Sequence, residues 1–124
     1  MSEKEKITGI GGVFFKANDA DLLRRWYGEH LGIDVDPNWG GAQFADTVWS
    51  IFKASSRYFD KPFMINYRVS NLDAMLAQLR AAGVQVDDKV EETEFGRFGW
   101  AMDPEGNRIE LWEPLRRELQ VEGQ

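Results

Sequence analysis

The chain has 124 residues, of which 43% are hydrophobic, so it can form the core of one domain. Its 15 basic and 21 acidic residues give a formal net charge of -6, which argues against nucleic acid and anionic membranes as partners because both bind basic surfaces. It contains no cysteine and only one histidine, which excludes disulfides, thiol nucleophiles and thiolate metal sites.

We expect the protein to be cytoplasmic. The stretch MSEKEKITG lacks the basic and apolar regions of a signal peptide, and no apolar run approaches the ~20 residues that a membrane-spanning helix needs. The acidic balance is ordinary for a soluble protein, although it would also attract small cations.

The first predicted unit begins with a strand and a helix. In GVFFKANDADLLRRWYGEHLGI, residues 12–33, the two-residue period of a strand precedes Asn18 or Asp19, either of which can cap a helix. Gly32 then supplies the left-handed conformation that ends a helix. The apolar residues of this helix recur at helical spacing: Leu22, Leu23, Trp26, Tyr27 and Leu31. Strand-like runs follow at 34–36, 42–45 and 48–53, separated by proline, asparagine and glycine.

The second unit repeats this plan. MINYRVSNLDAMLAQLRAAGV, residues 64–84, again predicts a strand, a cap at Ser70 or Asn71, an amphipathic helix and a final glycine, Gly83. The buried stripe of this helix is expected to be Leu72, Met75, Leu76 and Leu79. Strand-like runs follow from 85–86 onward, at 96–102 and at 107–112, and DPEG predicts a tight reversal before the last of them.

The sequence therefore predicts one α+β domain over residues 1–124, built from two βαβββ modules. Module one covers about 7–54, a connector 55–62, module two about 63–114 and a C-terminal tail 115–124. We expect a curled mixed sheet around a cavity, with the helices on its outer face. The stretch EPLRRELQVEGQ is a candidate for a short helix that docks on a second subunit.

Strand alternation assigns side chains to the two faces of this sheet. The residues expected to face the helices are Val13, Phe15, Trp49, Ile51, Ile65, Tyr67, Val69, Ile109 and Leu111. The concave face is expected to carry Gly12, Lys16, Val48 and a candidate ligand-binding set: Phe14, Ser50, Phe52, Met64, Asn66, Arg68, Trp100, Arg108, Glu110 and Trp112. Mostly apolar and aromatic groups with a few polar ones are typical of a small-molecule pocket. The alternative is that these side chains fill the interior or form a dimer contact.

The doubled plan and the stretches WYGEHLGI, NLDAMLAQLRAAGV and DPEGNRIELWEP resemble the vicinal oxygen chelate superfamily, which includes glyoxalase I, bleomycin resistance proteins and extradiol dioxygenases. The resemblance covers about residues 7–114. It is most specific in the last stretch, where a DP-E-GN turn leads into a strand with E-x-W. It also implies a homodimer, because these folds often complete their cavities across a two-fold interface.

Enzymes of that superfamily hold a divalent metal through one inward residue on each of four strands, and the metal acts as a Lewis acid toward substrate oxygens. The resemblance places these positions at Gly12, Ser50, Met64 and Glu110. A glycine offers no donor, a serine hydroxyl is a weak ligand, and a thioether is too soft for the hard cations of such sites. We therefore expect a degenerate metal site with no bound divalent metal and no other cofactor. His30, near the end of a helix, is expected to cap carbonyls or face solvent.

Glu110 is the good ligand that remains from this set. Arg108 lies two residues earlier on the same strand face, ~7 Å away by strand rise, where it could keep the carboxylate ionised in a charge-assisted pair. The alternative is a plain cross-strand pair near the sheet edge.

Three functions fit these features. The first is metal-independent binding of a small molecule, with sequestration of a bulky or cationic aromatic compound by Trp39, Trp49, Trp100, Trp112, Phe14 and Phe52. The second is an isomerase or lyase of a small carbonyl compound, with Glu110 as general base, Asn66 or Arg68 stabilising an enolate, and Arg97 entering from a loop. The third is a structural or partner-binding module.

Overall fold

The computed structural model describes residues 4–115, so the expected tail helix lies outside the described residues. The elements follow the order β1 (Ile7–Ala17), α1 (Ala20–Leu31), β2 (Gly41–Phe44), β3 (Thr47–Lys53), β4 (Phe63–Val69), α2 (Leu72–Ala81), β5 (Glu91–Thr93), β6 (Gly96–Met102) and β7 (Arg108–Pro114). The α+β class is confirmed; module two has the predicted βαβββ order, whereas module one has one strand fewer and is βαββ. No helix within the described range is long and apolar enough to cross a membrane.

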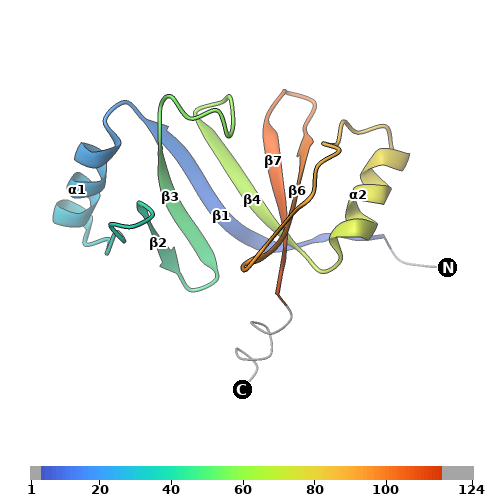
Figure 1. Ribbon diagram of the computed structural model, residues 1–124, viewed down its shortest axis with the longest axis horizontal. Coiled ribbons are helices and arrows are strands. Elements are labelled where there is room, and N and C mark those ends of the chain that lie inside the picture. The colour runs from blue at the N-terminus through green and yellow to red at the C-terminus, as the bar shows by residue number, and fades with distance from the viewer. Residues whose placement is uncertain (1–3, 116–124) are drawn as a thin grey trace, which may run out of the picture.

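The seven strands form one mixed sheet in the order β2-β3-β1-β4-β7-β6-β5. Within each module the first strand pairs in parallel with the last, β1 with β3 and β4 with β7, as a helical crossover allows. The two modules join where β1 and β4 pair antiparallel, with Gly12 opposite Asn66 and Phe14 opposite Met64. Figure 1 shows the sheet curled between α1 and α2, which lie at its opposite ends.

The helices begin and end at residues that the sequence indicates. Asp19 caps α1 by accepting a hydrogen bond from the backbone N–H of Leu22, at 3.0 Å. Asn71 caps α2 in the same way, accepting from the N–H of Ala74 at 3.0 Å. Gly32 and Gly83 have φ of 68° and 82°, which a side chain would disfavour.

Each helix covers its own apolar cluster. Under α2, Leu72, Met75 and Leu76 pack with Val69 and Leu111. Under α1 the cluster consists of Ala17, Ala20 and Ile51, with Phe15, Leu23, Tyr27 and Trp49 packed against it. Full burial of a leucine such as Leu72 contributes about 1.5–3 kcal/mol.

One prediction about the outer face was wrong. Val13 does not pack beneath α1; its side chain is 37% exposed, because the helices cover the two ends of the sheet and leave its middle open. Leu22, Trp26 and Leu31 are also exposed, since α1 turns only one narrow side toward the sheet. The apolar stripe of α1 is therefore wider than the surface it buries.

Two of the predicted strands are not strands. Residues 34–36 form a loop, because Asp36 bonds to the backbone of Gly40 and Gly41, at 2.8 Å each, and closes a turn around Pro37. At 85–86 the chain makes only an isolated bridge between Val86 and Ala101. The last two strands follow the prediction closely.

Candidate functional site

The concave face of the sheet carries the predicted set of inward side chains. The rings of Phe14 and Phe52 lie 5.5 Å apart on β1 and β3, and at the other end of the sheet Phe98 stacks on Trp112 at 5.7 Å. Between them lie Met64, Asn66 and Glu110, each no more than 2% exposed. Glu110 therefore points into the protein and is not a surface residue.

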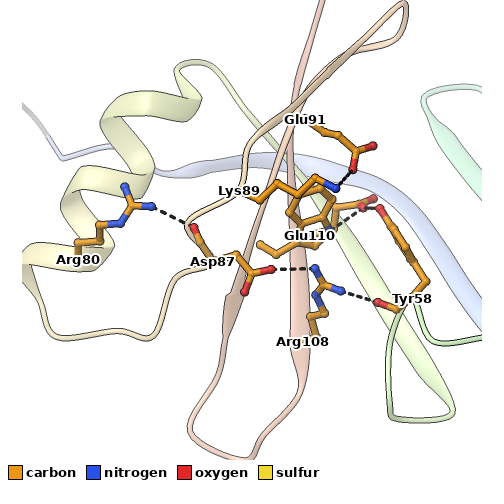
Figure 2. A network of polar contacts seen from close by, with 8 residues as sticks. Tyr58, Arg80, Asp87, Lys89, Glu91, Arg108 and Glu110 are labelled. Carbon is orange, nitrogen blue, oxygen red and sulfur yellow. Dashed lines mark hydrogen bonds and ion pairs between the residues drawn. The ribbon is translucent and has the colours of Figure 1, made fainter.

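Glu110 accepts hydrogen bonds from three neutral donors. Its neighbour on β4, Asn66, donates from Nδ2 to Oε1 at 2.7 Å, and its neighbour on β6, Trp100, donates from Nε1 to Oε2 at 2.9 Å. The hydroxyl of Tyr58 donates to Oε2 as well (Figure 2). Because an indole or amide N–H can only donate, this donor set suits the carboxylate form.

Tyr58 belongs to the connector between the modules, which closes over the concave face. Its ring stacks on Phe52 at 5.9 Å and meets Trp100 edge to face at 6.2 Å. Burial, followed by the nearby Glu110 carboxylate, raises the pKa of the Tyr58 phenol well above its ordinary value of 10.0. The hydroxyl thus stays protonated and remains a donor to Glu110. The next residue, Phe59, is 2% exposed and fills more of the same space.

Arg108 does not pair with Glu110, so that prediction was wrong. Its guanidinium donates to Asp87 Oδ2 at 2.9 Å and to the carbonyl oxygen of Tyr58 at 2.5 Å (Figure 2). It also lies over the Trp100 ring, 5.0 Å from the centroid. Arg108 therefore holds the connector on the sheet, and neutral donors hold Glu110.

The four family positions do not fit a metal ion. Gly12 has no donor atom and Met64 offers a fully buried thioether, while both oxygens of Glu110 already accept hydrogen bonds. Ser50 lies on β3 at the place that Glu110 occupies on β7, and it supplies one hydroxyl. Within residues 4–115 no three histidine, aspartate or glutamate side chains come together as a ligand group. His30 is exposed on α1 beside Trp26.

Arg68 and Asn66 each leave one buried polar atom without a partner among the described residues. Arg68 lies over the Trp112 ring at 4.5 Å and donates to the carbonyl of Asp46 at 2.8 Å, but its Nε has no acceptor. Asn66 Oδ1 lies against Gly11, where a Cβ atom would collide with it. Because Gly11 has no side chain, the Asn66 amide fits beside Glu110.

Arg97 does not enter the concave face. It pairs with Asp73 and Glu92, at 2.9 and 3.1 Å, and so ties the β5–β6 hairpin to α2. This contact lowers the pKa of Asp73, chiefly through the hydrogen bond. A catalytic role for Arg97 has no support from this geometry.

An open cavity of about 300 Å³ lies at the end of β3. Two members of the predicted ligand-binding set, Ser50 and Phe52, line it together with Arg24, Trp39 and Lys53. The centre of the concave face, by contrast, is filled by Tyr58, Phe59 and Trp100. This hollow is therefore displaced from the family metal position toward module one.

Sequence reasoning missed Tyr58, Phe59 and Asp87. All three lie in connecting segments, where no periodicity fixes the direction of a side chain. The adjacent aromatic residues of RYFDKP were the available signal, because two consecutive rings in a polar connector need a place to be buried.

Comparisons with known proteins agree with this fold. The model of the family described as glyoxalase-like domain matches residues 12–112. The crystal structure of methylmalonyl-CoA epimerase from Mycobacterium tuberculosis is similar at 24% identity and a TM-score of 0.67, covering 97% of both chains. A glyoxalase/bleomycin resistance protein/dioxygenase superfamily member from Vibrio splendidus 12B01 is similar at 9% identity and a TM-score of 0.64, covering 89% of this chain and 99% of that one.

A methylmalonyl-CoA epimerase from Streptomyces coelicolor gives 16% identity and a TM-score of 0.64, covering 88% of this chain and 99% of the other. At these identities the solved structures establish the fold alone. Among curated proteins no sequence gives a significant match. The family model covers most of the chain and includes both modules, and the chain belongs to the glyoxalase-like domain family.

Proposed function

We propose that this protein binds a small molecule on the concave side of its sheet without the help of a metal ion. The observation that supports this most directly is the state of Glu110, whose two carboxylate oxygens accept bonds from Asn66, Trp100 and Tyr58. Only one lone pair, on Oε1, remains free for a divalent cation, and the other three family positions supply no anionic ligand.

The enclosed position of the Glu110 carboxylate argues against its acting as a general base. A base needs a lone pair within hydrogen-bond reach of the proton that it removes. Glu110 is 2% exposed, and the phenol of Tyr58 donates to its Oε2. Substrate could reach the carboxylate only after the connector had moved, which would also break the bond between Arg108 and the Tyr58 carbonyl.

The cationic side chains that already cover the aromatic rings indicate which ligand charge is favoured. Lys16 lies over Phe59 at 5.1 Å, Arg68 over Trp112 at 4.5 Å and Arg108 over Trp100 at 5.0 Å. A cationic compound would have to compete with these side chains for the ring faces and would be repelled by them. We therefore favour a neutral or anionic ligand over the cationic compound suggested by the net charge.

An isomerase is the second candidate, and one observation favours it: similar solved structures include methylmalonyl-CoA epimerases. An enzyme of that kind moves a proton at carbon, for which Glu110 would be the base. This candidate requires that substrate binding release Glu110 from Tyr58.

Two measurements separate these candidates. Calorimetric titration of a panel of cationic, neutral and anionic aromatic compounds, with and without EDTA, should find a ligand whose affinity does not respond to the chelator. Incubation with methylmalonyl-CoA in deuterated water, followed by mass spectrometry, should show no exchange above that of buffer. Exchange that Glu110→Gln abolishes would establish the isomerase instead.

A further inference from the structure

The cavity at the end of β3 lies where the neighbouring strand β2 no longer pairs with it. Pairing between β2 and β3 ends where Gly41 lies opposite Ser50, so β3 continues to Lys53 without a partner strand on that side. The backbone of Ile51 turns to this edge, where its N–H bonds to Gly40 and its carbonyl accepts from Arg24. Since alternate residues of a strand present their N–H groups to the same edge, the N–H of Lys53 faces this edge too.

Two consecutive glycines fix the walls of the cavity. The indole of Trp39 lies against Gly41, where a Cβ atom would overlap the ring, and Trp39 is nevertheless 46% exposed. The guanidinium of Arg24 lies against Gly40 in the same manner. A ring and a cation that rest on backbone are held in place before a ligand arrives, which lowers the entropic cost of binding.

Arg24 is held by three acceptors and keeps free donors. Its Nε bonds to the Gly40 carbonyl at 3.2 Å, and its two terminal nitrogens bond to Asp21 at 3.1 Å and the Ile51 carbonyl at 2.6 Å. A guanidinium has five N–H donors. Three of them bond to described residues, which leaves two for a ligand.

The charge of the cavity lining is positive, although the protein as a whole is acidic. Arg24 and Lys53 line it, and no aspartate or glutamate does. Asp19 and Asp21 line an adjoining hollow that shares Lys53 and Ser55, but both are engaged, since Asp19 caps α1 and Asp21 pairs with Arg24. Lys53 forms no ion pair with any residue between 4 and 115. The lining also contains the hydroxyls of Ser50, Ser55 and Ser56.

We propose that this cavity binds a small planar anion, with its ring against Trp39 and Phe52 and its carboxylate or similar group toward Lys53. This inference rests on the proposed metal-independent binding function and names its ligand class and its place. Lys53, the free donors of Arg24 and the serine hydroxyls supply charge-assisted hydrogen bonds to the anionic group. A cavity of about 300 Å³ accommodates one small aromatic compound.

The test uses three probes that share one ring and differ in charge: a naphthalene carboxylate, its neutral amide, and the cationic naphthylmethylammonium. Each is titrated by calorimetry into wild-type protein and into Lys53→Gln and Trp39→Leu variants. Lys61→Gln and Trp26→Leu serve as matched controls, because Lys61 is exposed outside the cavity and Trp26 is 46% exposed, the same as Trp39.

The carboxylate should bind with one site per chain and more tightly than the other two probes. Lys53→Gln should weaken it about fivefold and Trp39→Leu by roughly tenfold, whereas the controls should bind as wild type does. Equal affinity for all three probes, no binding of the carboxylate, or carboxylate binding that neither cavity variant changes would overturn the inference. If another probe or panel compound still binds, the proposed function survives that failure. If no compound of either set binds, both fail.

Discussion

Replacement of Tyr58 by phenylalanine isolates one of the three donors that hold Glu110. The variant loses the hydroxyl and keeps the ring, so the stacking on Phe52 and the contact with Trp100 persist. The bond from Arg108 goes to the backbone carbonyl of Tyr58 and is also retained. The change therefore removes one hydrogen bond to a buried carboxylate and little else.

The expected cost is about 1.5–3 kcal/mol of unfolding free energy at neutral pH, the range for a hydrogen bond to a charged group. A second effect appears at alkaline pH. The pKa of Tyr58 is raised in the folded state, so the unfolded chain releases this proton first, above pH 10.0. The contribution of Tyr58 is complete below that pH and declines as the pH rises, by about 1.4 kcal/mol per unit. Tyr58→Phe should lack this part of the alkaline decline.

Urea unfolding followed by circular dichroism, at neutral pH and at several values above 10.0, measures both effects. Tyr67→Phe is the matched control, because no hydrogen bond of the Tyr67 hydroxyl to a described residue is present. If Tyr58→Phe is as stable as that control at neutral pH and shows the alkaline slope of wild type, the donor role of Tyr58 is refuted.

Two further variants test the local geometry. Gly11→Ala should lower the unfolding free energy by about 1–3 kcal/mol, because its methyl group would overlap Asn66 Oδ1, whereas Gly9→Ala, with its nearest atom 3.9 Å away, should cost under about 0.5 kcal/mol in the same urea experiment. The side chain and backbone of Asn107 lower the pKa of Asp103 below its ordinary 3.8, so this carboxylate stabilises the fold above that pH and ceases to do so as the pH falls through its folded value. Asp103→Asn should therefore flatten the loss of stability in that acid range, and an unchanged acid titration would contradict the assignment.

Local chemistry is why so much of the fold could be predicted from the sequence. Asp19 and Asn71 cap helices through side chains that reach only a few residues, and Gly32 ends α1 through its own backbone angles. Strand alternation placed Asn66 and Glu110 on one face, and the parallel pairing of β4 and β7 sets them side by side. These features depend on near neighbours in the chain or on a period of two, and both can be read without tertiary information.

The candidate site could be predicted only in part, because its decisive residues come from segments without periodicity. Tyr58 reaches Glu110 from the connector, and Asp87 takes Arg108 from a loop after α2. Strand spacing alone suggested that Arg108 would pair with Glu110. The long side chain of Arg108 turns instead to Asp87, which is more exposed than Glu110. The cavity beside Trp39 likewise depends on where β2 begins, and pairing with β3 sets that point.

We propose that this glyoxalase-like protein works without a metal ion, and elemental analysis tests this proposal most directly. Protein purified after growth with added nickel, manganese, zinc and iron should contain far less than one equivalent of any of them. The affinity of its best aromatic ligand should be unchanged by EDTA. One tightly held ion per chain, with ligand binding that disappears on chelation, would contradict the account.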